Sequence, residues 1–160
     1  NYRISDISCA LGVSQLRRLD TIIRLRAEAA RRYGSLLRDV PDVVTPLILP
    51  DVTTMSWFVY VIRLADAYTR ADRDWLIEWL ARRNIGTRPY FTPIHLQPFY
   101  VKEFGCRPGD FPVTEHVAER TISLPFFTRI TPDQQKVVVD ALKQGIGVLR
   151  KEVGRCGFRR

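Results

Sequence analysis

The chain is poor in the residues that build metal and disulfide sites. It has three cysteines, Cys9, Cys106 and Cys156, and two histidines, His95 and His116. The cysteines are odd in number, irregularly spaced and without a Cys-x-x-Cys pair, which supports neither a zinc site nor a thiol redox motif. We therefore expect no bound metal. Cys9 falls on the apolar side of a predicted helix and is interpreted as a small buried hydrophobic residue.

Long apolar runs are missing as well. No stretch approaches the ~18 apolar residues that cross a bilayer, and no basic segment followed by an apolar one opens the chain. We therefore expect no membrane partner and, since nothing requires oxidised cysteines, a cytoplasmic setting. The first residue is Asn1 rather than methionine, which suggests a fragment or a processed product.

The composition supports one compact domain with an excess of positive charge. The 160 residues are 46% hydrophobic, and 25 lysines and arginines against 17 acidic residues give a formal charge of +8. Such an excess can indicate an anionic partner, either nucleic acid or a phosphorylated ligand. Part of it forms a stripe of period seven, Arg17, Arg24, Arg31 and Arg38. This stripe is more typical of a solvated helix face. The basic tail at 150–160 has no assigned role.

The first half of the chain alternates between helical and extended patterns. Residues 5–38 predict one long helix that begins at a capping serine, Ser5. Its apolar positions recur every three to four residues: Ile7, Leu11, Leu16, Leu19, Ile22, Ile23, Ala30, Tyr33 and Leu37. Residues 57–64 are β-branched and aromatic and predict a strand. The segment Thr69-Arg70-Ala71-Asp72 has the form of a capping box and predicts a second helix that ends near Arg83.

The second half continues the alternation. A second strand is expected near residues 87–91, bent or at a sheet edge because Pro89 cannot donate to a ladder. Residues 92–111 read as a long loop, followed by a short helix at 112–120 and a strand at 121–125. A capping box at Thr131–Gln134 predicts a final helix to about Arg150. The order of these helices and strands predicts an α/β fold in which helices cover a small antiparallel or mixed sheet. Residues 1–160 are expected to form a single domain.

Three segments, in this order, carry a resemblance to a known family. They are Asn1-Tyr2-Arg3-Ile4-Ser5-Asp6, Pro93-Ile94-His95-Leu96-Gln97-Pro98 and Ser123-Leu124-Pro125. Over residues 1–145 the chain resembles the C-terminal small domain of the DegT/StrS family of sugar aminotransferases, which use pyridoxal phosphate (PLP). The segment Thr87-Arg88-Pro89-Tyr90-Phe91 is similar to perosamine-synthase-like members, which aminate C4 of GDP-linked keto sugars.

The resemblance implies both a fold and a reaction. The fold would be the small domain of an aspartate-aminotransferase-like, fold type I PLP enzyme. The intact protein would convert a keto nucleotide sugar to an amino sugar, with PLP as cofactor, glutamate as amino donor and a homodimer as the working form. In that family the catalytic lysine precedes the Asn-Tyr-Arg segment. We therefore expect the PLP-binding large domain to lie outside this chain.

The lysines agree with that expectation. The chain has four, Lys102, Lys136, Lys143 and Lys151, all in polar segments. A Schiff-base lysine needs desolvation or neighbouring cations to lower its pKa, and neither pattern occurs here. We expect no catalytic residue in this chain, and no transaminase activity from it alone.

Two groups of residues are candidates for binding. By resemblance, Asn1 would contact the PLP phosphate of the partner subunit, and Arg3 would neutralise a phosphate or pair near the helix start. The resemblance also implies a substrate loop, with Arg88, Tyr90, Phe91 and His95 as the candidate residues. A planar guanidinium suits a diphosphate, and aromatic faces suit a sugar or a base. Without the resemblance, the histidine reads as a hydrogen-bonded structural residue.

Two other functions stay open. The chain could be an inactive interaction module that keeps the small-domain fold after loss of the large domain. It could also be a small basic nucleic-acid-binding domain that uses the arginine stripe. The second is the least favoured, because the chain lacks an RNP-type aromatic motif, a zinc signature and a helix-turn-helix. We therefore expect no nucleic-acid partner.

Overall fold

A small antiparallel sheet lies at the centre of the structure, a computed structural model that describes residues 2–48 and 55–156. Within these residues the sheet has four strands in the order β1-β2-β4-β3. They are β1 (Val43–Val44), β2 (Tyr60–Leu64), β3 (Arg88–Pro89) and β4 (Thr121–Leu124). The helices are α1 (Asp6–Leu16), α2 (Leu19–Leu37), α3 (Arg70–Ala81), α4 (Pro98–Phe104), α5 (Pro112–Ala118) and α6 (Pro132–Cys156), with a 3₁₀ turn η1 (Ile94–Leu96). The predicted α/β class is confirmed.

The two central strands are held by their apolar alternation. Tyr60 lies opposite Leu124 and Ile62 opposite Ile122 in the register of β2 and β4. Alternate residues of β2 are buried, as expected for a sheet with one face on the core. β3 is confined to two residues at the sheet edge. This position agrees with the prediction from Pro89, which cannot donate a ladder hydrogen bond.

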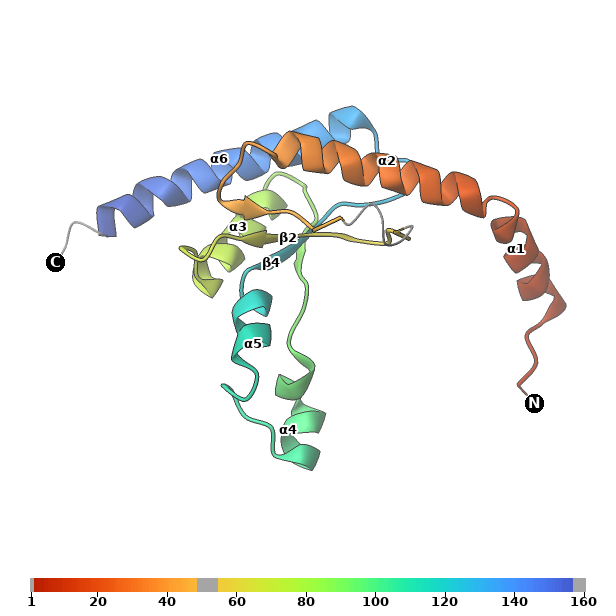
Figure 1. Ribbon diagram of the computed structural model, residues 1–160, viewed down its shortest axis with the longest axis horizontal. Helices are drawn as coiled ribbons and strands as arrows, with labels where there is room; N and C mark the ends of the chain where they lie inside the picture. The colour runs from red at the N-terminus through yellow and green to blue at the C-terminus, as the bar shows by residue number, and fades with distance from the viewer. Residues whose placement is uncertain (1, 49–54, 157–160) are drawn as a thin grey trace.

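Helices α2, α3 and α6 complete the core, and together with the sheet we call them the body. α2 and α6 lie side by side, and α3 packs against α6 (Figure 1). Tyr33 of α2 is fully buried, stacks on Tyr60 at 4.9 Å, and donates its hydroxyl to the carbonyl of Pro125 at 2.8 Å. α3 and α6 meet closely at Gly145, where a Cβ would lie 2.5 Å from a methyl of Leu76.

The helix ends follow the capping signals in the sequence. Ser5 accepts from the backbone N–H of Ser8, and Thr69 and Asp72 form a complete capping box. A second capping box joins Thr131 and Gln134 through hydrogen bonds of 2.9 and 3.2 Å. These contacts satisfy N–H groups that have no partner inside the helix. They therefore fix where α1, α3 and α6 begin.

The predicted single helix over residues 5–38 is wrong, because the chain breaks at Arg17 and Arg18. Arg18 has φ −107° and ψ 4°, outside the helical range. No residue of α1 is buried, and α1 projects away from the body (Figure 1). Cys9, expected to be buried, is therefore exposed. The apolar residues of α1 lie on several sides rather than on one stripe, so packing on the body does not hold it in line with α2.

Three smaller expectations also need correction. The predicted loop at 92–111 contains η1 and α4. Pro98 occupies the first turn of α4, and Gly105 ends it with φ +65°, a conformation that glycine adopts without strain. The final helix extends to Cys156 rather than Arg150. β1 was not predicted, since a two-residue strand has too little alternation to be recognised.

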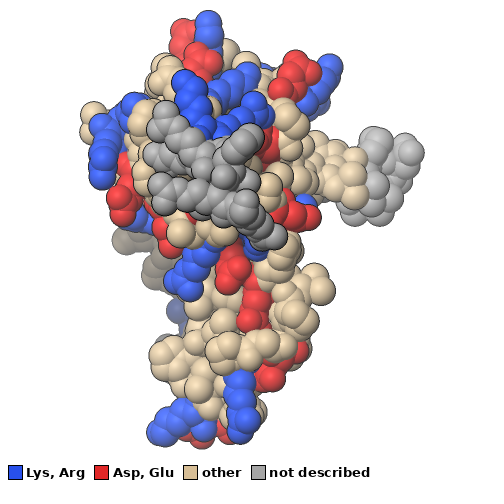
Figure 2. Space-filling view, turned by 90° about the vertical axis from the view of Figure 1, so that its left-hand side faces the viewer, with Lys and Arg blue, Asp and Glu red and all other residues tan. Residues whose placement is uncertain are grey.

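Residues 92–118, with η1, α4 and α5, form a protrusion that we call the arm. It extends from the sheet on the side away from α2 and α6 (Figure 1). Neither α4 nor α5 has a buried residue. Uncharged side chains cover most of its visible surface, whereas charged ones crowd the body (Figure 2). None of the helices in the described residues is both long and apolar enough to span a membrane.

Candidate functional site

A groove of about 710 Å³ runs along the arm. Its lining is mainly apolar and comes from the chain before η1, from η1, α4 and α5: Tyr90, Phe91, Pro93, Ile94, His95, Tyr100, Cys106, Phe111, Val113, Thr114, Val117 and Ala118. Three of the four residues predicted for the substrate loop, Tyr90, Phe91 and His95, thus meet in one groove. A concave apolar surface with few polar groups is the usual form of a ligand site.

The aromatic residues of the groove differ in exposure. Phe91 is 53% exposed, whereas Tyr90 is partly buried. Their rings meet edge to face at 4.9 Å, and the peptide bond between them is cis. Phe111 is also exposed, and its ring centroid lies 4.8 Å from that of His95. The flat faces expected from the sequence are therefore available to a ring-shaped ligand.

Among the residues that line the groove, only His95 is buried. Only 8% of it is exposed, and its Nε2 lies 2.9 Å from the Oε1 of Glu115 in α5. Hydrogen bonds from His95 and from the backbone N–H of Gly109 favour the charged carboxylate and lower the pKa of Glu115. The histidine is therefore hydrogen-bonded to the protein and also lines the groove.

The root of the arm is fixed by buried polar side chains. The Thr121 hydroxyl, in β4, lies 2.8 Å from the carbonyl of Tyr90 and 3.3 Å from that of Ala118. Arg73, in α3 and only 5% exposed, donates to the same Ala118 carbonyl at 3.1 Å and pairs with Asp74. Because these contacts tie both ends of the arm to β4 and α3, the groove keeps a defined position relative to the body.

Arg88 lies outside the groove. It is exposed at the sheet edge, where its carbonyl accepts from the Ser123 hydroxyl at 3.1 Å. Only Pro89 separates it from Tyr90, but β3 ends at Pro89, so strand alternation does not extend to Tyr90. Among the described residues the Arg88 side chain makes no ion pair. It is therefore free to reach an anionic part of a ligand whose ring occupies the groove.

The residues present do not make a complete site for PLP. Asn1 lies outside the described residues, and Arg3 is exposed. The lysines are exposed as well, and Lys102, with 83% of its side chain accessible, lies 3.6 Å from Glu103. A lysine that carries a Schiff base needs a desolvated or cationic setting, which none of these has. We therefore assign no chemical step on PLP to this chain.

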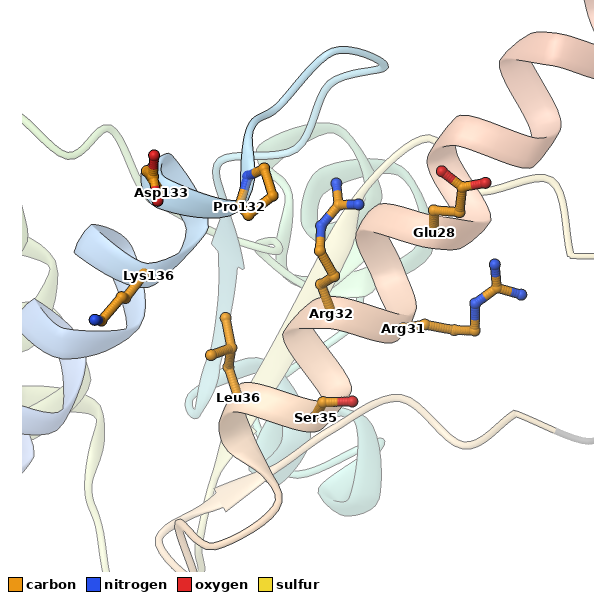
Figure 3. Close-up of a pocket in the computed structure, with 8 residues that line it drawn as sticks. All are labelled: Glu28, Arg31, Arg32, Ser35, Leu36, Pro132, Asp133 and Lys136. Carbon is orange, nitrogen blue, oxygen red and sulfur yellow. The ribbon is translucent and has the colours of Figure 1, made fainter.

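A second groove, of about 600 Å³, lies between α2 and the start of α6 (Figure 3). Both charge signs line it, since Glu28 and Asp133 accompany Arg31 and Lys136. Arg31 and Lys136 point in opposite directions in this view. The remaining arginine, Arg32, is held by Gln135 and the carbonyl of Ile130. The cations do not converge on one point, so this groove is a weaker candidate than the one on the arm.

Sequence reasoning missed Glu115, Tyr100 and Phe111. Glu115 had a local signal, because an acid in the first turn after Pro112 commonly reaches back to a backbone N–H. It does so here, at 3.4 Å from the N–H of Phe111. Tyr100 and Phe111 had no such signal, since the sequence does not reveal that α4 and α5 enclose one groove.

The fold defines the class first: helices cover a small antiparallel sheet, an α/β arrangement of the aspartate-aminotransferase-like, fold type I kind. The family follows from sequence. A model of the DegT/DnrJ/EryC1/StrS aminotransferase family matches residues 1–143, and the chain belongs to that family.

Two relatives illustrate the match. The chain is 36% identical to the uncharacterized protein MJ1066 of Methanocaldococcus jannaschii over 143 residues, which are 89% of this chain and 37% of the relative. It is 34% identical to the spore coat polysaccharide biosynthesis protein SpsC of Bacillus subtilis over 139 residues, 86% of this chain and 36% of SpsC. The chain thus spans little more than a third of the length of these relatives.

Solved structures of aminotransferases are similar to this chain in fold. The aminotransferase TlmJ from Streptoalloteichus hindustanus is 30% identical, with a TM-score of 0.79 over 92% of this chain and 38% of TlmJ. The PLP form of the putative sugar aminotransferase Spr1654 from Streptococcus pneumoniae has a TM-score of 0.83 over 89% of this chain and 36% of that protein. Its identity is 22%, so this second likeness supports the fold alone.

Proposed function

We propose that the chain is the C-terminal small domain of a PLP-dependent aminotransferase that converts a keto nucleotide sugar to an amino sugar. Glutamate would be the amino donor, and a homodimer the working form. The domain that binds PLP and carries the Schiff-base lysine would be a separate part of the intact enzyme. In the intact enzyme, PLP would supply the amino-transfer chemistry, and this chain would supply contacts to the substrate. A perosamine-type reaction at C4 of a GDP-linked sugar is the narrower form of the proposal.

The groove on the arm is the observation that carries this proposal. Tyr90, Phe91 and His95 come together there, and Arg88 lies exposed near the entry to the same segment. A nucleotide sugar offers flat rings, hydroxyls and a diphosphate. Aromatic faces suit the rings, the histidine can exchange hydrogen bonds with hydroxyls, and a guanidinium suits the diphosphate.

The two other functions receive less support. Exposed Arg17, Arg31 and Arg38 would serve a nucleic-acid surface, but Arg24 pairs with Glu28 at 2.8 Å and acids line the neighbouring groove. An inactive interaction module would have the same fold. An inactive module would need no ligand groove of this size. A measurement of ligand binding therefore distinguishes the inactive module from the enzyme domain.

Substitution of Arg88 tests the substrate assignment in the intact enzyme. Arg88→Ala should weaken nucleotide-sugar binding by ~1.5–3 kcal/mol, because a charge-assisted hydrogen bond to the diphosphate is lost. The visible spectrum of bound PLP should not change. Arg38→Ala removes another exposed arginine, at the end of α2, and serves as the matched control with parent affinity.

Two further measurements separate the parts of the proposal. Asn1→Ala should loosen PLP with less effect on the sugar, since Asn1 is proposed to contact the cofactor phosphate of the partner subunit. The 160-residue chain alone, titrated with PLP, should give no saturable aldimine band. Parent-like kinetics and PLP binding in both Arg88→Ala and Asn1→Ala would contradict the site assignment. A stoichiometric aldimine on Lys102, Lys136, Lys143 or Lys151 would contradict the division between domains.

A further inference from the structure

Glu115 connects three separate parts of the arm. Its two carboxylate oxygens accept from the backbone N–H of Gly109 at 2.8 and 3.0 Å, and Oε1 also meets Nε2 of His95 at 2.9 Å. The N–H of Phe111 lies 3.4 Å away. Gly109 has φ +95°, which glycine adopts far more readily than other residues. A single carboxylate thus joins η1 to the turn before α5.

The chemistry of this contact fixes the proton on His95. The pKa of Glu115 lies below its ordinary value because His95 and the backbone of Gly109 stabilise the charged form. An ionised carboxylate can only accept hydrogen bonds. Nε2 of His95 must then carry the hydrogen, and in the neutral ring Nδ1 is left as an acceptor. In the described part of the chain, Nδ1 has no hydrogen-bond partner.

The surroundings of the pair keep this arrangement rigid. His95 is 8% exposed, the side chain of Glu115 is 20% exposed, and the Phe111 ring contacts the imidazole at 4.8 Å. Partial exclusion of water strengthens a charge-assisted hydrogen bond. The imidazole is therefore locked in orientation as well as in tautomer, and it lines the groove.

We propose that Glu115 is a positioning residue for the ligand of the groove: it holds His95 in the Nε2–H form, so that Nδ1 accepts a hydrogen bond from a hydroxyl of the sugar. This inference rests on the proposed function, because it needs a ligand with a hydroxyl donor. Glu115 itself acts through His95. A ligand that carried only acceptors at this point would be disfavoured, so the pair also contributes to specificity.

The other histidine provides an internal control. His116 also has its Nε2 next to a carboxylate, 3.0 Å from Asp66, but its side chain is 45% exposed and that of Asp66 is 71% exposed. Water competes for such a contact. The two histidines thus have the same type of partner in different settings, one in the groove and one on the surface.

Nitrogen-15 NMR of the histidine rings in the full 160-residue chain tests the first half of the proposal. At pH 7.5, His95 should show the Nε2–H tautomer with a slowly exchanging ring proton. Glu115→Ala should convert it to a mixture of tautomers, whereas Glu115→Gln, which keeps an acceptor oxygen, should retain most of the Nε2–H form. Asp66→Asn should alter only His116. A parent His95 in the Nδ1–H form, or in rapid exchange, would overturn the proposal.

Titration of the same substitutions, made in the intact enzyme, with GDP-mannose and UDP-glucose tests the second half. For whichever probe binds the parent, Glu115→Ala should reduce affinity at least fivefold, Glu115→Gln less than twofold and Asp66→Asn not at all. Parent affinity in Glu115→Ala would overturn the positioning role. If neither probe binds the parent, the proposed function fails. The tautomer of His95 in the parent and in Glu115→Ala still decides whether Glu115 positions the ring.

Discussion

The body and the arm of this protein are held together by different interactions. In the body, Ile62, Leu76 and Leu142 are completely buried, and α2, α3 and α6 share one apolar core with the sheet. In the arm, α4 and α5 bury no residue, and polar contacts through Glu115, Thr121 and Arg73 fix its shape. The buried apolar contacts that stabilise the fold are therefore concentrated in the body. The arm keeps large apolar side chains exposed, Phe99, Phe104 and Val113 among them.

The largest effect should come from a cavity in the body. Leu142→Ala removes a fully buried side chain and should lower the free energy of unfolding by about 3 kcal/mol. For a chain of this size, that corresponds to a fall in melting temperature of roughly 6–12 °C. Phe104→Ala, on α4 and 67% exposed, should cost less than about 0.5 kcal/mol. Thermal unfolding followed by circular dichroism measures both, and equal losses would contradict the division into body and arm.

Alkaline pH should destabilise the body next most strongly. Burial raises the pKa of Tyr60 from 10.0 to about 12 and that of Tyr33 further still. The folded state holds these protons more tightly than the unfolded state. Stability is therefore fully present below pH 10 and is lost as the pH rises through the folded pKa. For Tyr60 alone, the free energy of unfolding should be lower by about 2 kcal/mol near pH 11.5.

Urea unfolding at pH 8, 10 and 11.5 measures this dependence. Tyr60→Phe keeps the ring but has no phenolic proton, so its stability should fall less steeply over the same range. Identical pH profiles for the parent and Tyr60→Phe would show that this hydroxyl does not stay protonated in the folded body.

The root of the arm should give an intermediate effect. Arg73→Met removes the donor to the Ala118 carbonyl while keeping an unbranched apolar stem, and should cost about 1–2 kcal/mol. Hydrogen exchange should become faster in α5 and remain slow in β2. Arg70→Met is the matched control, because Arg70 is exposed and lies 3.7 Å from the same Asp74. Uniform acceleration of exchange across the body would mean that Arg73 supports the core and not the arm.

The smallest effect on stability should come from α1. Ile7 and Leu11 are 85% and 61% exposed and lie one turn apart, so Ile7→Ser/Leu11→Ser should change the free energy of unfolding by less than about 0.5 kcal/mol. Association should weaken, because exposed apolar patches drive contact between molecules. Light scattering at high concentration tests this, with Val137→Ser on α6 as control. A parent that stays monomeric would contradict the association we expect from α1.

Local signals explain which elements could be predicted. The capping boxes at Thr69–Asp72 and Thr131–Gln134 placed the starts of α3 and α6, and Asn84, with φ +59°, follows the end of α3. The break at Arg18 could not be foreseen, because neither glycine nor proline marks it. Whether α1 continues α2 depends on surfaces outside α1, and none within residues 2–48 and 55–156 buries a residue of α1.

The candidate site likewise includes residues proposed from the sequence and a contact that only the structure shows. The resemblance to the family pointed to Tyr90, Phe91 and His95 as substrate-loop residues, and the structure places all three along one groove. The sequence did not identify Glu115, twenty residues further along, as the partner of His95. That pairing depends on how η1 and α5 meet. From the sequence, Glu115 can be related only to the backbone N–H groups at the start of its own helix, α5.

By itself, the sequence determined the class of fold, the caps and the family, because hydrophobic periodicity, capping residues and short motifs are properties of neighbouring residues. Only the tertiary structure decided that α1 leaves the body, that the arm encloses a groove without burying a helix, and that His95 meets Glu115. Each of these depends on contacts between segments far apart in the chain. Their free energy depends on which surfaces the fold brings together.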